Sequence, residues 1–339
     1  MLLLVGVLST AAPGSAGLRG EDSDASVIAF VHWSADGRGG RYRLYAFDPQ
    51  TREVRAARCV RGDVPRLWSP DGTRMIVFGP RDSVSVLSTE SGRLERLGHS
   101  VANAAWSPDS RRLAVVQSAG TGWPRLSVIS LEDDRIRELT RGRNPEWAPD
   151  ERIFFVGSGG TFSISSEGGE KLRVARDLAR GLAVSPDGKK IAFEGDGPRS
   201  GLFVADALGH NRRQLYTGFF AGIAWSPDSK RIAFAPMSSG RGVMVINADG
   251  TALTKLDRSA RAYAFNPTWS PDGRFIVYGS PYATLDSGVT FDDLFVVPSG
   301  GGRPQRITAG QRLRGSYDSP AWLPRSVLGN WKTSPLRAC

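Results

Sequence analysis

Cysteine and histidine are scarce in this chain of 339 residues, which has two of the former and three of the latter. Two cysteines exclude a disulfide-dense miniprotein and a four-cysteine zinc module. The three histidines are His32, His99 and His210. The strand pattern described below places the first two in connections at one end of the molecule and the third at the other end, so we expect no three-histidine metal centre. The pentapeptide G-x-S-x-G is absent, which excludes a hydrolase that uses this nucleophile elbow.

Lysine is also scarce, since six lysines stand against 38 arginines in a chain of net charge +10. Arginine binds carboxylates and phosphates through its planar fork, so the excess suits an anionic partner. A bias in genomic base composition is the other explanation. The arginines are scattered, and neither a basic run nor a known module points to nucleic acid, so we expect no nucleic-acid binding. Apolar residues make up 40% of the chain, which is enough for a buried core.

The chain begins with an apolar stretch, Leu2–Leu8, followed by small residues up to Ala16. This pattern predicts a signal peptide over residues 1–16; because no basic residue precedes Arg19, an ordinary strand is the alternative. The stretch is too short to cross a bilayer, so we expect no membrane span and a periplasmic or secreted protein. We divide the rest into a linker at 17–25, a repeat domain at 26–324 and a C-terminal tail at 325–339.

A five-residue motif, Trp-Ser-Pro-Asp-Gly or a close variant, recurs every 37 to 44 residues through the repeat domain. A period near forty with strand-like content is typical of a β-propeller in which each repeat forms one four-stranded blade. In each repeat we expect an inner strand ending at the tryptophan, a wholly apolar second strand, a third strand of alternating polarity and a polar outer strand. The copies are Trp68–Gly72, Trp106–Ser110, Trp147–Glu151, Val184–Gly188, Trp225–Ser229 and Trp269–Gly273, with a decayed copy at Ala321–Ser326.

The two ends of the repeat domain complement each other. Three expected strands, Val27–Trp33, Tyr42–Phe47 and Glu53–Ala57, precede the first motif without an inner strand, and a lone inner strand, Ala321–Leu323, follows the last repeat. Pairing this last strand with the first three closes the ring and leaves no sheet exposed at a gap. We therefore predict an all-β, seven-bladed β-propeller that is a monomer, with six blades as the second choice.

The motif itself has a structural explanation. Proline presets the first corner of a turn, aspartate accepts a hydrogen bond from the backbone two residues on, and glycine takes a left-handed conformation. We interpret the aspartates as turn caps rather than as a ring of metal ligands, and the tryptophans as packing residues between blades. The six aspartates are Asp71, Asp109, Asp150, Asp187, Asp228 and Asp272.

The motif followed by a basic residue, isoleucine, alanine and phenylalanine, as in Ser185–Phe193 and Trp225–Phe234, resembles the repeat of TolB-like propellers. The resemblance extends over about residues 26–324 and implies the propeller fold. TolB carries an α/β domain before its propeller, and because about 25 residues precede the first expected strand here, we expect that domain to be missing. Similar repeats also form the propellers of prolyl-oligopeptidase-like peptidases and of oligogalacturonate lyases.

One mouth of the central channel is the expected ligand site, because the connections between blades and those between second and third strands surround it. Cations mixed with aromatic side chains there suit a protein, an acidic peptide or a carboxylated glycan. The Phe219–Phe220 pair is hard to explain on a solvent-facing loop, and burial in the channel wall is the rival explanation. The candidate ligand-binding residues are Arg66, Asn103, Arg143, Asn144, Arg180, Phe219, Phe220, Tyr263, Asn266, Tyr317 and Asp318.

The longest connection at this mouth, Ser280–Asp293, is a candidate flap. Its aspartates, Asp286, Asp292 and Asp293, offer oxygens of the kind that calcium binds, but their spacing is irregular and we interpret the segment as a solvated acidic loop. We therefore expect no cofactor.

The two cysteines lie near the expected closure of the ring. Cys59 follows the outer strand of the first blade and Cys339 ends the chain, so a disulfide between them would staple that blade in an oxidising compartment. Free thiols are the alternative.

Two functions remain open at this point. We favour an exported, non-enzymatic scaffold that binds a protein or an acidic glycan at the channel mouth. The alternative is a secreted lyase or hydrolase with a carboxylate–arginine site at the same mouth. A bound divalent metal or a close pair of carboxylates there would favour the enzyme.

Overall fold

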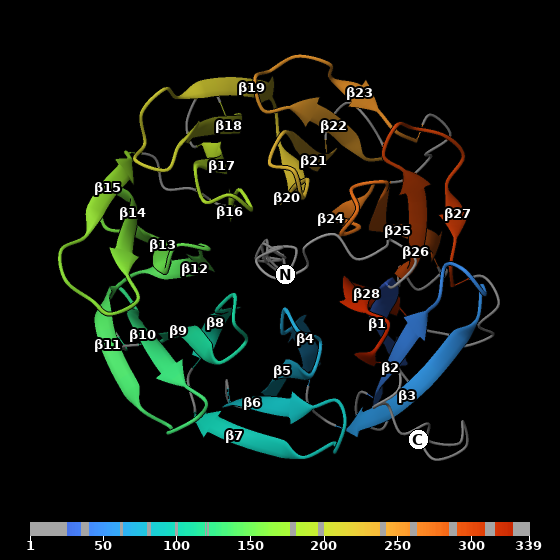
Figure 1. Cartoon of the computed structure of the whole chain (residues 1–339), viewed down its shortest axis with the longest axis horizontal. Helices are drawn as coiled ribbons and strands as arrows, with labels where there is room; N and C mark the ends of the chain where they lie inside the picture. Colours follow the sequence, from blue (N-terminus) through green and yellow to red (C-terminus); the bar gives the residue numbers. More distant parts are fainter. Residues whose placement is uncertain are drawn as a thin grey trace.

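The computed structural model describes residues 26–34, 41–61, 64–79, 83–98, 101–118, 120, 122–176, 181–195, 200–237, 242–257, 263–284, 290–308 and 316–327. Within these ranges 28 strands form seven four-stranded antiparallel sheets. The sheets stand side by side in a ring, so the fold is the predicted seven-bladed β-propeller (Figure 1). The predicted signal peptide and linker, together with His99, Arg180, Asp286 and Cys339, lie outside the described residues.

Each blade radiates outward from an innermost strand. Blade 1 contains β28 (Ser316–Pro324), β1 (Ser26–Ser34), β2 (Arg41–Phe47) and β3 (Val54–Arg61), and blade 2 contains β4 (Val64–Trp68), β5 (Arg74–Gly79), β6 (Ser83–Ser88) and β7 (Leu94–Gly98). Blade 3 contains β8 (Val101–Trp106), β9 (Arg112–Gln117), β10 (Arg125–Ser130) and β11 (Ile136–Arg141), and blade 4 contains β12 (Arg143–Trp147), β13 (Arg152–Gly157), β14 (Gly160–Ser165) and β15 (Leu172–Ala175).

The remaining three blades follow the same plan. Blade 5 contains β16 (Leu182–Val184), β17 (Lys190–Gly195), β18 (Gly201–Asp206) and β19 (Arg213–Thr217). Blade 6 contains β20 (Phe220–Trp225), β21 (Arg231–Pro236), β22 (Met244–Asn247) and β23 (Thr254–Lys255), and blade 7 contains β24 (Phe265–Trp269), β25 (Phe275–Thr284), β26 (Thr290–Pro298) and β27 (Gln305–Arg306).

The C-terminal strand closes the ring as predicted. Strand β28 pairs antiparallel with β1, with Trp322 opposite Ile28 and Leu323 opposite Val27, so the last strand completes the blade that the first three begin. The closing strand is longer than the expected Ala321–Leu323, and it also packs against β26 of blade 7. Strand β3 likewise runs on to Arg61, so Cys59 lies within it, opposite Arg43, rather than after it.

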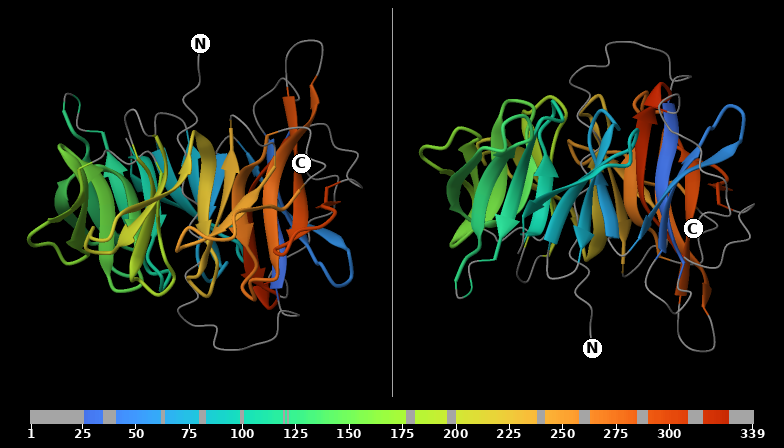
Figure 2. Two further views of the ribbon diagram at one scale, coloured as in Figure 1. Left: turned by 90° about the horizontal axis from the view of Figure 1, so that it is seen from above. Right: turned by 90° about the horizontal axis from the view of Figure 1, so that it is seen from below.

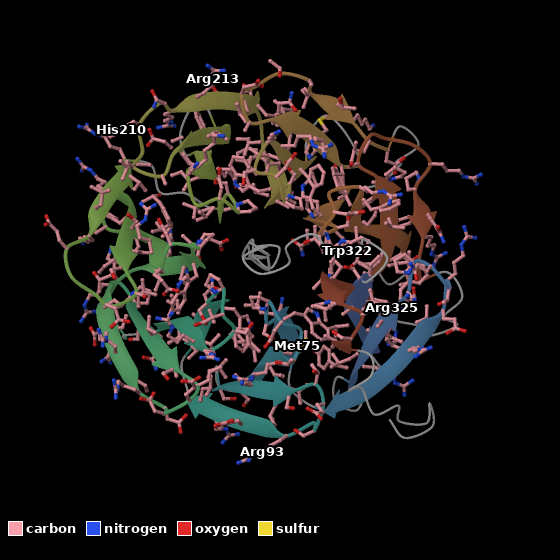
Figure 3. All side chains as sticks on the ribbon, viewed as in Figure 1. Met75, Arg93, His210, Arg213, Trp322 and Arg325 are labelled. Carbon is pink, nitrogen blue, oxygen red and sulfur yellow. The ribbon has the colours of Figure 1, made fainter. Side chains whose placement is uncertain are left out.

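The hydrophobic core lies between the blades. Seven clusters of buried side chains each combine residues of two neighbouring blades, as where Met75 of blade 2 packs with Val27 and Leu323 of blade 1. Figure 3 shows Met75 and Trp322 inside the wall of the ring and Arg93, His210 and Arg213 at its outer rim. Because neighbouring sheets cover both faces of each blade, the third strands are buried along most of their length, as in β6 and β18, and the expected alternation of exposure is wrong.

The repeated turns connect first and second strands. In the turn at residues 69–73, the Ser69 hydroxyl donates to Asp71 Oδ1 at 2.6 Å, and the same carboxylate accepts the Thr73 amide at 3.0 Å. The equivalent aspartates, Asp109, Asp150, Asp187, Asp228 and Asp272, also accept the amide two residues on. The fifth residue of the motif has a positive φ in each turn, from 58° at Ser229 to 70° at Gly72, which explains the frequent glycine there.

The motif tryptophans join neighbouring blades. Trp225 and Trp269 are buried, and their indole N–H groups donate to the Ala183 and Ala224 carbonyl oxygens of the preceding blade, each at 3.0 Å. Trp106 donates to Leu67 O at 3.2 Å in the same way. Each of these rings therefore contributes both apolar burial and a hydrogen bond to the contact between two blades.

The ring has two unlike ends. We call the end that carries the Ser-Pro-Asp turns the turn end, and the end that carries the connections between blades, such as Gly142 and Gly218–Phe219, the loop end. At the loop end the β25–β26 hairpin of blade 7 is longer than its counterparts and rises above the ring (Figure 2).

Candidate functional site

The loop end holds the residues that the sequence nominated for binding, but mostly within strands rather than in loops. Arg66, Asn103, Arg143, Asn144, Phe220 and Asn266 lie in the innermost strands β4, β8, β12, β20 and β24. Tyr317 and Asp318 lie in β28, where they pair with His32 and Val31, so their expected place in a loop is wrong. Phe219 and Tyr263 precede strands, as expected.

The three asparagines mark irregularities of the channel wall. Each lies three residues before a motif tryptophan, where the register of the innermost strand shifts against its neighbour. Asn144 and Asn266 have φ values of 52° and 48°, in the left-handed region that asparagine tolerates better than most residues. Asn103 donates from Nδ2 to Asn144 Oδ1 at 3.2 Å, which links blades 3 and 4. These amides therefore shape the inner wall of the ring.

The two adjacent phenylalanines have opposite surroundings. Phe220 is 3% exposed and packs edge-on against Phe234, with ring centroids 5.7 Å apart, whereas Phe219 is 48% exposed. Successive residues at the start of a strand point to opposite sides, so one ring enters the core between blades 5 and 6 while the other remains outside. Burial is thus the explanation for Phe220, which is a core residue and not a ligand-binding one.

Besides Phe219, two further exposed apolar side chains lie at the loop end of blades 6 and 7. Met237 is 52% exposed, and its backbone N–H donates to Phe219 O at 2.9 Å. Tyr263, at the entry to the next blade, is 53% exposed, and its carbonyl oxygen accepts a hydrogen bond from Ser280 at the base of the projecting hairpin. We call Phe219, Met237 and Tyr263 the apolar sector. Sequence reasoning missed Met237, whose signal was an apolar residue in a connection otherwise rich in serine and glycine.

Elsewhere on the loop end, two arginines contact Trp123 and a third pairs with one of them. The Arg143 guanidinium carbon lies 5.5 Å from the centre of the Trp123 ring, and Arg141 Nη1 donates to Trp123 O at 3.1 Å. Arg125 is the direct cross-strand partner of Arg141. We call Arg125, Arg141 and Arg143, with Trp123, the arginine cluster. Sequence reasoning found only Arg143; the missed signal was Trp123, which stands outside the repeated motif.

Several titratable side chains near the loop end are buried and committed to structural contacts. His32 lies in β1 rather than in a connection, and burial, helped by the nearby positive charge of Arg43, lowers its pKa to about 4. Burial raises the pKa of Tyr278, as does its neighbour Asp257, whose Oδ2 accepts the phenol at 3.0 Å. His210 is exposed and lies in a turn at the opposite end of the ring, so it cannot join a site at the loop end.

The expected acidic flap is largely a pair of strands. Asp293 lies in β26 and is completely buried; it accepts the Thr308 hydroxyl at 2.6 Å and pairs with Arg306. Burial raises the pKa of Asp293 against the opposing effects of Thr308 and Arg306. The interpretation of this segment as a solvated acidic loop is therefore wrong for Asp293, and Asp292 likewise lies in the strand β26 rather than in a loop.

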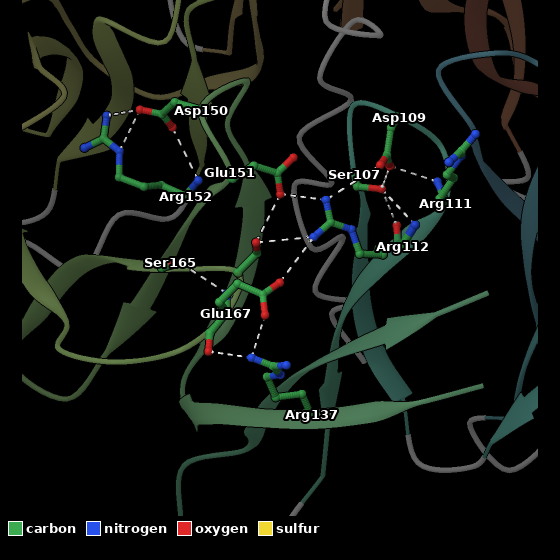
Figure 4. A network of polar contacts seen from close by, with 11 residues as sticks. Ser107, Asp109, Arg111, Arg112, Arg137, Asp150, Glu151, Arg152, Ser165 and Glu167 are labelled. Carbon is green, nitrogen blue, oxygen red and sulfur yellow. Dashed lines mark hydrogen bonds and ion pairs between the residues drawn. The ribbon is translucent and has the colours of Figure 1, made fainter. Parts of the chain in front are cut away.

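Charged side chains at the turn end form ion pairs with one another (Figure 4). Arg112 of blade 3 reaches Glu151 of blade 4 at 2.7 Å, and Arg137 reaches Glu167 at 2.6 Å. Arg112 also lies over the Trp147 ring, 5.1 Å from its centre. A pairing within one turn is present at Asp150 and Arg152, at 2.6 Å, but Arg112 is nearer to the acid of the next blade than to Asp109 of its own turn, at 3.6 Å.

No group of three or more histidine, cysteine, aspartate or glutamate side chains in the described part of the chain is arranged to hold a metal ion. Across those same residues, no helix has the length and apolar character needed to cross a membrane.

Solved structures share this fold, whereas no protein-family model and no curated protein matches the sequence. The β-propeller domain of the Trilobed protease from Pyrococcus furiosus aligns with a TM-score of 0.60 at 15% identity, over 83% of this chain and 94% of that one. Oligogalacturonate lyase from Vibrio parahaemolyticus aligns with a TM-score of 0.58 at 13% identity, over 83% and 84%. A putative TolB from Agrobacterium tumefaciens aligns with a TM-score of 0.50 at 17% identity, over 84% and 88%.

These likenesses confirm the TolB-like propeller fold that the repeat indicated, and at such identities they concern the fold alone. One topological difference stands out. The Trilobed protease domain has an open velcro topology, whereas here β28 pairs with β1 and closes the ring.

Proposed function

We propose that this protein is an exported, non-enzymatic TolB-like propeller that binds a partner protein at its loop end. The observation that supports this most directly is the apolar sector. Phe219, Met237 and Tyr263 are each about half exposed, and they gather on one end of two neighbouring blades. Exposed aromatic and methionine side chains are enriched at protein interfaces, because they bury a large area when a partner covers them.

The rest of the exposed apolar residues have a different setting. Leu94, Ile136 and Leu172 begin the outer strands of three separate blades, and Leu208 and Leu253 lie between the third and outer strands of two more, where single exposed apolar residues are ordinary. The apolar sector instead adjoins the projecting β25–β26 hairpin, through the hydrogen bond from Ser280 to Tyr263 O. A partner that covers the sector therefore also meets a raised wall on one side.

The test uses the full chain with a photo-crosslinking amino acid in place of Phe219, added to an envelope extract. We expect a protein adduct at this position and none when the same amino acid replaces Ile136 on the outer rim. The variant M237A/Y263A, probed from position 219, should lose the adduct, whereas the matched rim variant L94A/L172A should keep it. Equal adducts from both positions, or an adduct that resists protease and yields to glycosidases, would contradict a protein partner at the apolar sector.

For the alternative, an enzyme with a carboxylate–arginine site, the described residues of the loop end offer an exposed pair, Arg125 with Glu138 at 3.8 Å, and a buried one, Asp293 with Arg306. Asp293 is completely buried and hydrogen-bonded to Thr308, so a substrate has no access to it without unfolding β26. We therefore favour binding. Assaying the purified protein against acidic polysaccharides with added divalent metals tests this choice, and turnover abolished by D293N would reverse it.

Export is part of the proposal and rests on the apolar start of the sequence, Leu2–Leu8, and the small residues after it. We expect the mature protein in the periplasmic or extracellular fraction, beginning near residue 17. N-terminal sequencing of the fractionated protein checks this, and a cytoplasmic protein that retains residues 1–16 would contradict it.

A further inference from the structure

We infer that the arginine cluster is a recognition site for the carboxylates of an acidic peptide segment, and this rests on the proposed function in taking the partner to be a protein. The site comprises Arg125, Arg141 and Arg143 around Trp123, at the loop end of blades 3 and 4. It lies on different blades from the apolar sector, which belongs to blades 6 and 7. Each surface can therefore be tested without disturbing the other.

The backbone holds the cluster in place. A single residue, Gly142, separates the outer strand of blade 3 from the inner strand of blade 4, and its amide donates to Pro124 O at 2.9 Å. A Cβ at this position would lie 2.3 Å from Phe155 Cδ2, so only glycine permits so close a crossing. The short connection fixes Arg141 and Arg143 on either side of it, next to the connection that contains Trp123.

The cluster gathers positive charge against an electrostatic cost. Arg125 and Arg141 stand directly opposite each other on β10 and β11, an arrangement that destabilises a sheet when the charges are alike. Among the described residues, an ion pair of this cluster joins Arg125 to Glu138 at 3.8 Å, and both side chains are half exposed. At the turn end of the same two blades, by contrast, Arg112, Arg137 and Arg152 each lie within 2.7 Å of a carboxylate.

The side chains are presented for contact with a ligand. All three arginines are exposed, and the Trp123 ring supports the Arg143 guanidinium, which leaves the edges of the fork available to a carboxylate. Stacking also removes part of the rotamer freedom that a long cation otherwise loses when it binds.

The spread of the arginines favours a ligand with several anionic groups. They lie on three strands, β10, β11 and β12, and all three are exposed. A single exposed ion pair contributes little to the free energy of binding, so tight binding at such a surface requires several contacts at once. A peptide with consecutive acidic side chains supplies them, whereas a free phosphate engages only one point of the cluster.

The test measures fluorescence anisotropy of labelled hexaglutamate titrated with the full chain at low ionic strength. We expect saturable binding that weakens as salt is added, because exposed charge pairs are screened. The variant R125Q/R141Q/R143Q should lose affinity by about tenfold or more, as expected when several charge-assisted contacts are removed together. The matched control R93Q/R111Q/R135Q removes the same charge at the other end of neighbouring blades and should bind within about twofold of the natural chain.

Three results would overturn the inference. If both triple variants weaken hexaglutamate binding equally, net charge alone attracts the probe. If the natural chain does not bind hexaglutamate, the site does not exist. If inorganic phosphate at equal concentration competes with hexaglutamate, the cluster is a site for a free anion. The variant R143K, which keeps the charge but loses the planar fork, should weaken binding by about threefold and covers the case in which the triple variant fails to fold. The apolar-sector variant F219A/M237A/Y263A should bind hexaglutamate normally, so failure here and failure of the proposed function are distinguishable.

Discussion

Blades 3 and 4 carry an arginine stacked on a tryptophan at each of their two ends, and the two stacks differ in what surrounds them. At the turn end, Arg112 lies over Trp147 and is ion-paired with Glu151. At the loop end, Arg143 lies over Trp123 among other arginines. The same strands therefore support a neutralised contact at one end and a concentration of positive charge at the other.

The difference follows from the connections. At the turn end, five of the seven repeats contribute the same Ser-Pro-Asp turn, and contacts such as Asp71 N to Ser110 Oγ and Arg112 to Glu151 hold adjacent blades together. At the loop end, each connection has its own length and composition, from the single Gly142 to the raised β25–β26 hairpin. A uniform end suits assembly of the ring, and a varied end suits recognition.

The largest contrast should come from truncating the two tryptophans. Trp147 is 6% exposed and fills the contact between blades 3 and 4, so Trp147→Ala should lower the free energy of unfolding by about 3–5 kcal/mol. Trp123 is only partly buried, so Trp123→Ala should cost about 1–2 kcal/mol. Urea denaturation followed by circular dichroism measures both, and equal losses would contradict the distinction between the ends.

Removing the stacked arginines should give a smaller contrast in the same direction. Arg112→Ala removes the ion pair with Glu151 and the contact with Trp147, and should cost about 1–2 kcal/mol. Arg143→Ala relieves repulsion as it removes a contact, and should change the free energy of unfolding by less than about 0.5 kcal/mol. Chemical denaturation at low salt checks both variants. A loss at Arg143 as large as that at Arg112 would show that the loop-end stack is structural.

Acid should act on the two ends in opposite senses. Burial works against ionisation of Asp109, but the hydrogen bonds from Ser107 and the Arg111 amide, with the charge of Arg112, hold its pKa below the ordinary 3.8; Asp187 and Asp228 are alike. Such groups contribute stability that is present above pH 3.8 and is lost as pH falls through their folded pKa values. Asp293 has a raised pKa, so its contribution is present at low pH and is lost as pH rises through that value.

Two variants separate these effects in a pH series of unfolding free energies. The triple variant D109N/D187N/D228N should flatten the loss of stability below about pH 4, because it removes the groups that must be protonated. Asp293→Asn should instead act above pH 3.8, because it removes a group whose protonation in the folded protein adds stability as pH falls from its raised pKa towards that value. A triple variant that changes only the range above pH 3.8, or an Asp293 variant that changes only the range below it, would refute the assignment.

Salt should produce the smallest effect. Replacing Glu151 and Glu167 by glutamine removes two carboxylates of the turn-end network and leaves the positive charges of both ends. We expect added salt to stabilise this variant by about 0.5 kcal/mol relative to the natural chain, because screening then acts mainly on repulsion. Thermal denaturation over a range of sodium chloride concentrations measures this. An identical salt dependence in both proteins would show that the network contributes nothing.

Most of the fold could be predicted from the amino-acid sequence. A repeat of about forty residues specifies the blade, and because each blade contacts mainly its neighbours, counting the motifs also counts the blades. The unmatched strands at the two ends of the domain likewise predicted the pairing of β28 with β1. These features are local or periodic in the chain, so they can be recognised from the sequence alone.

Only the tertiary structure decided which side chains are available for binding. Phe219 and Phe220 are neighbours of the same type, yet the start of β20 sends one into the core and leaves the other outside. Trp123 and Arg143 are separated in sequence, yet the Arg143 guanidinium lies over the Trp123 ring where Gly142 lets two blades approach closely. Strand phase and the packing of one sheet on the next set these outcomes, and neither is encoded by the identity of a single residue.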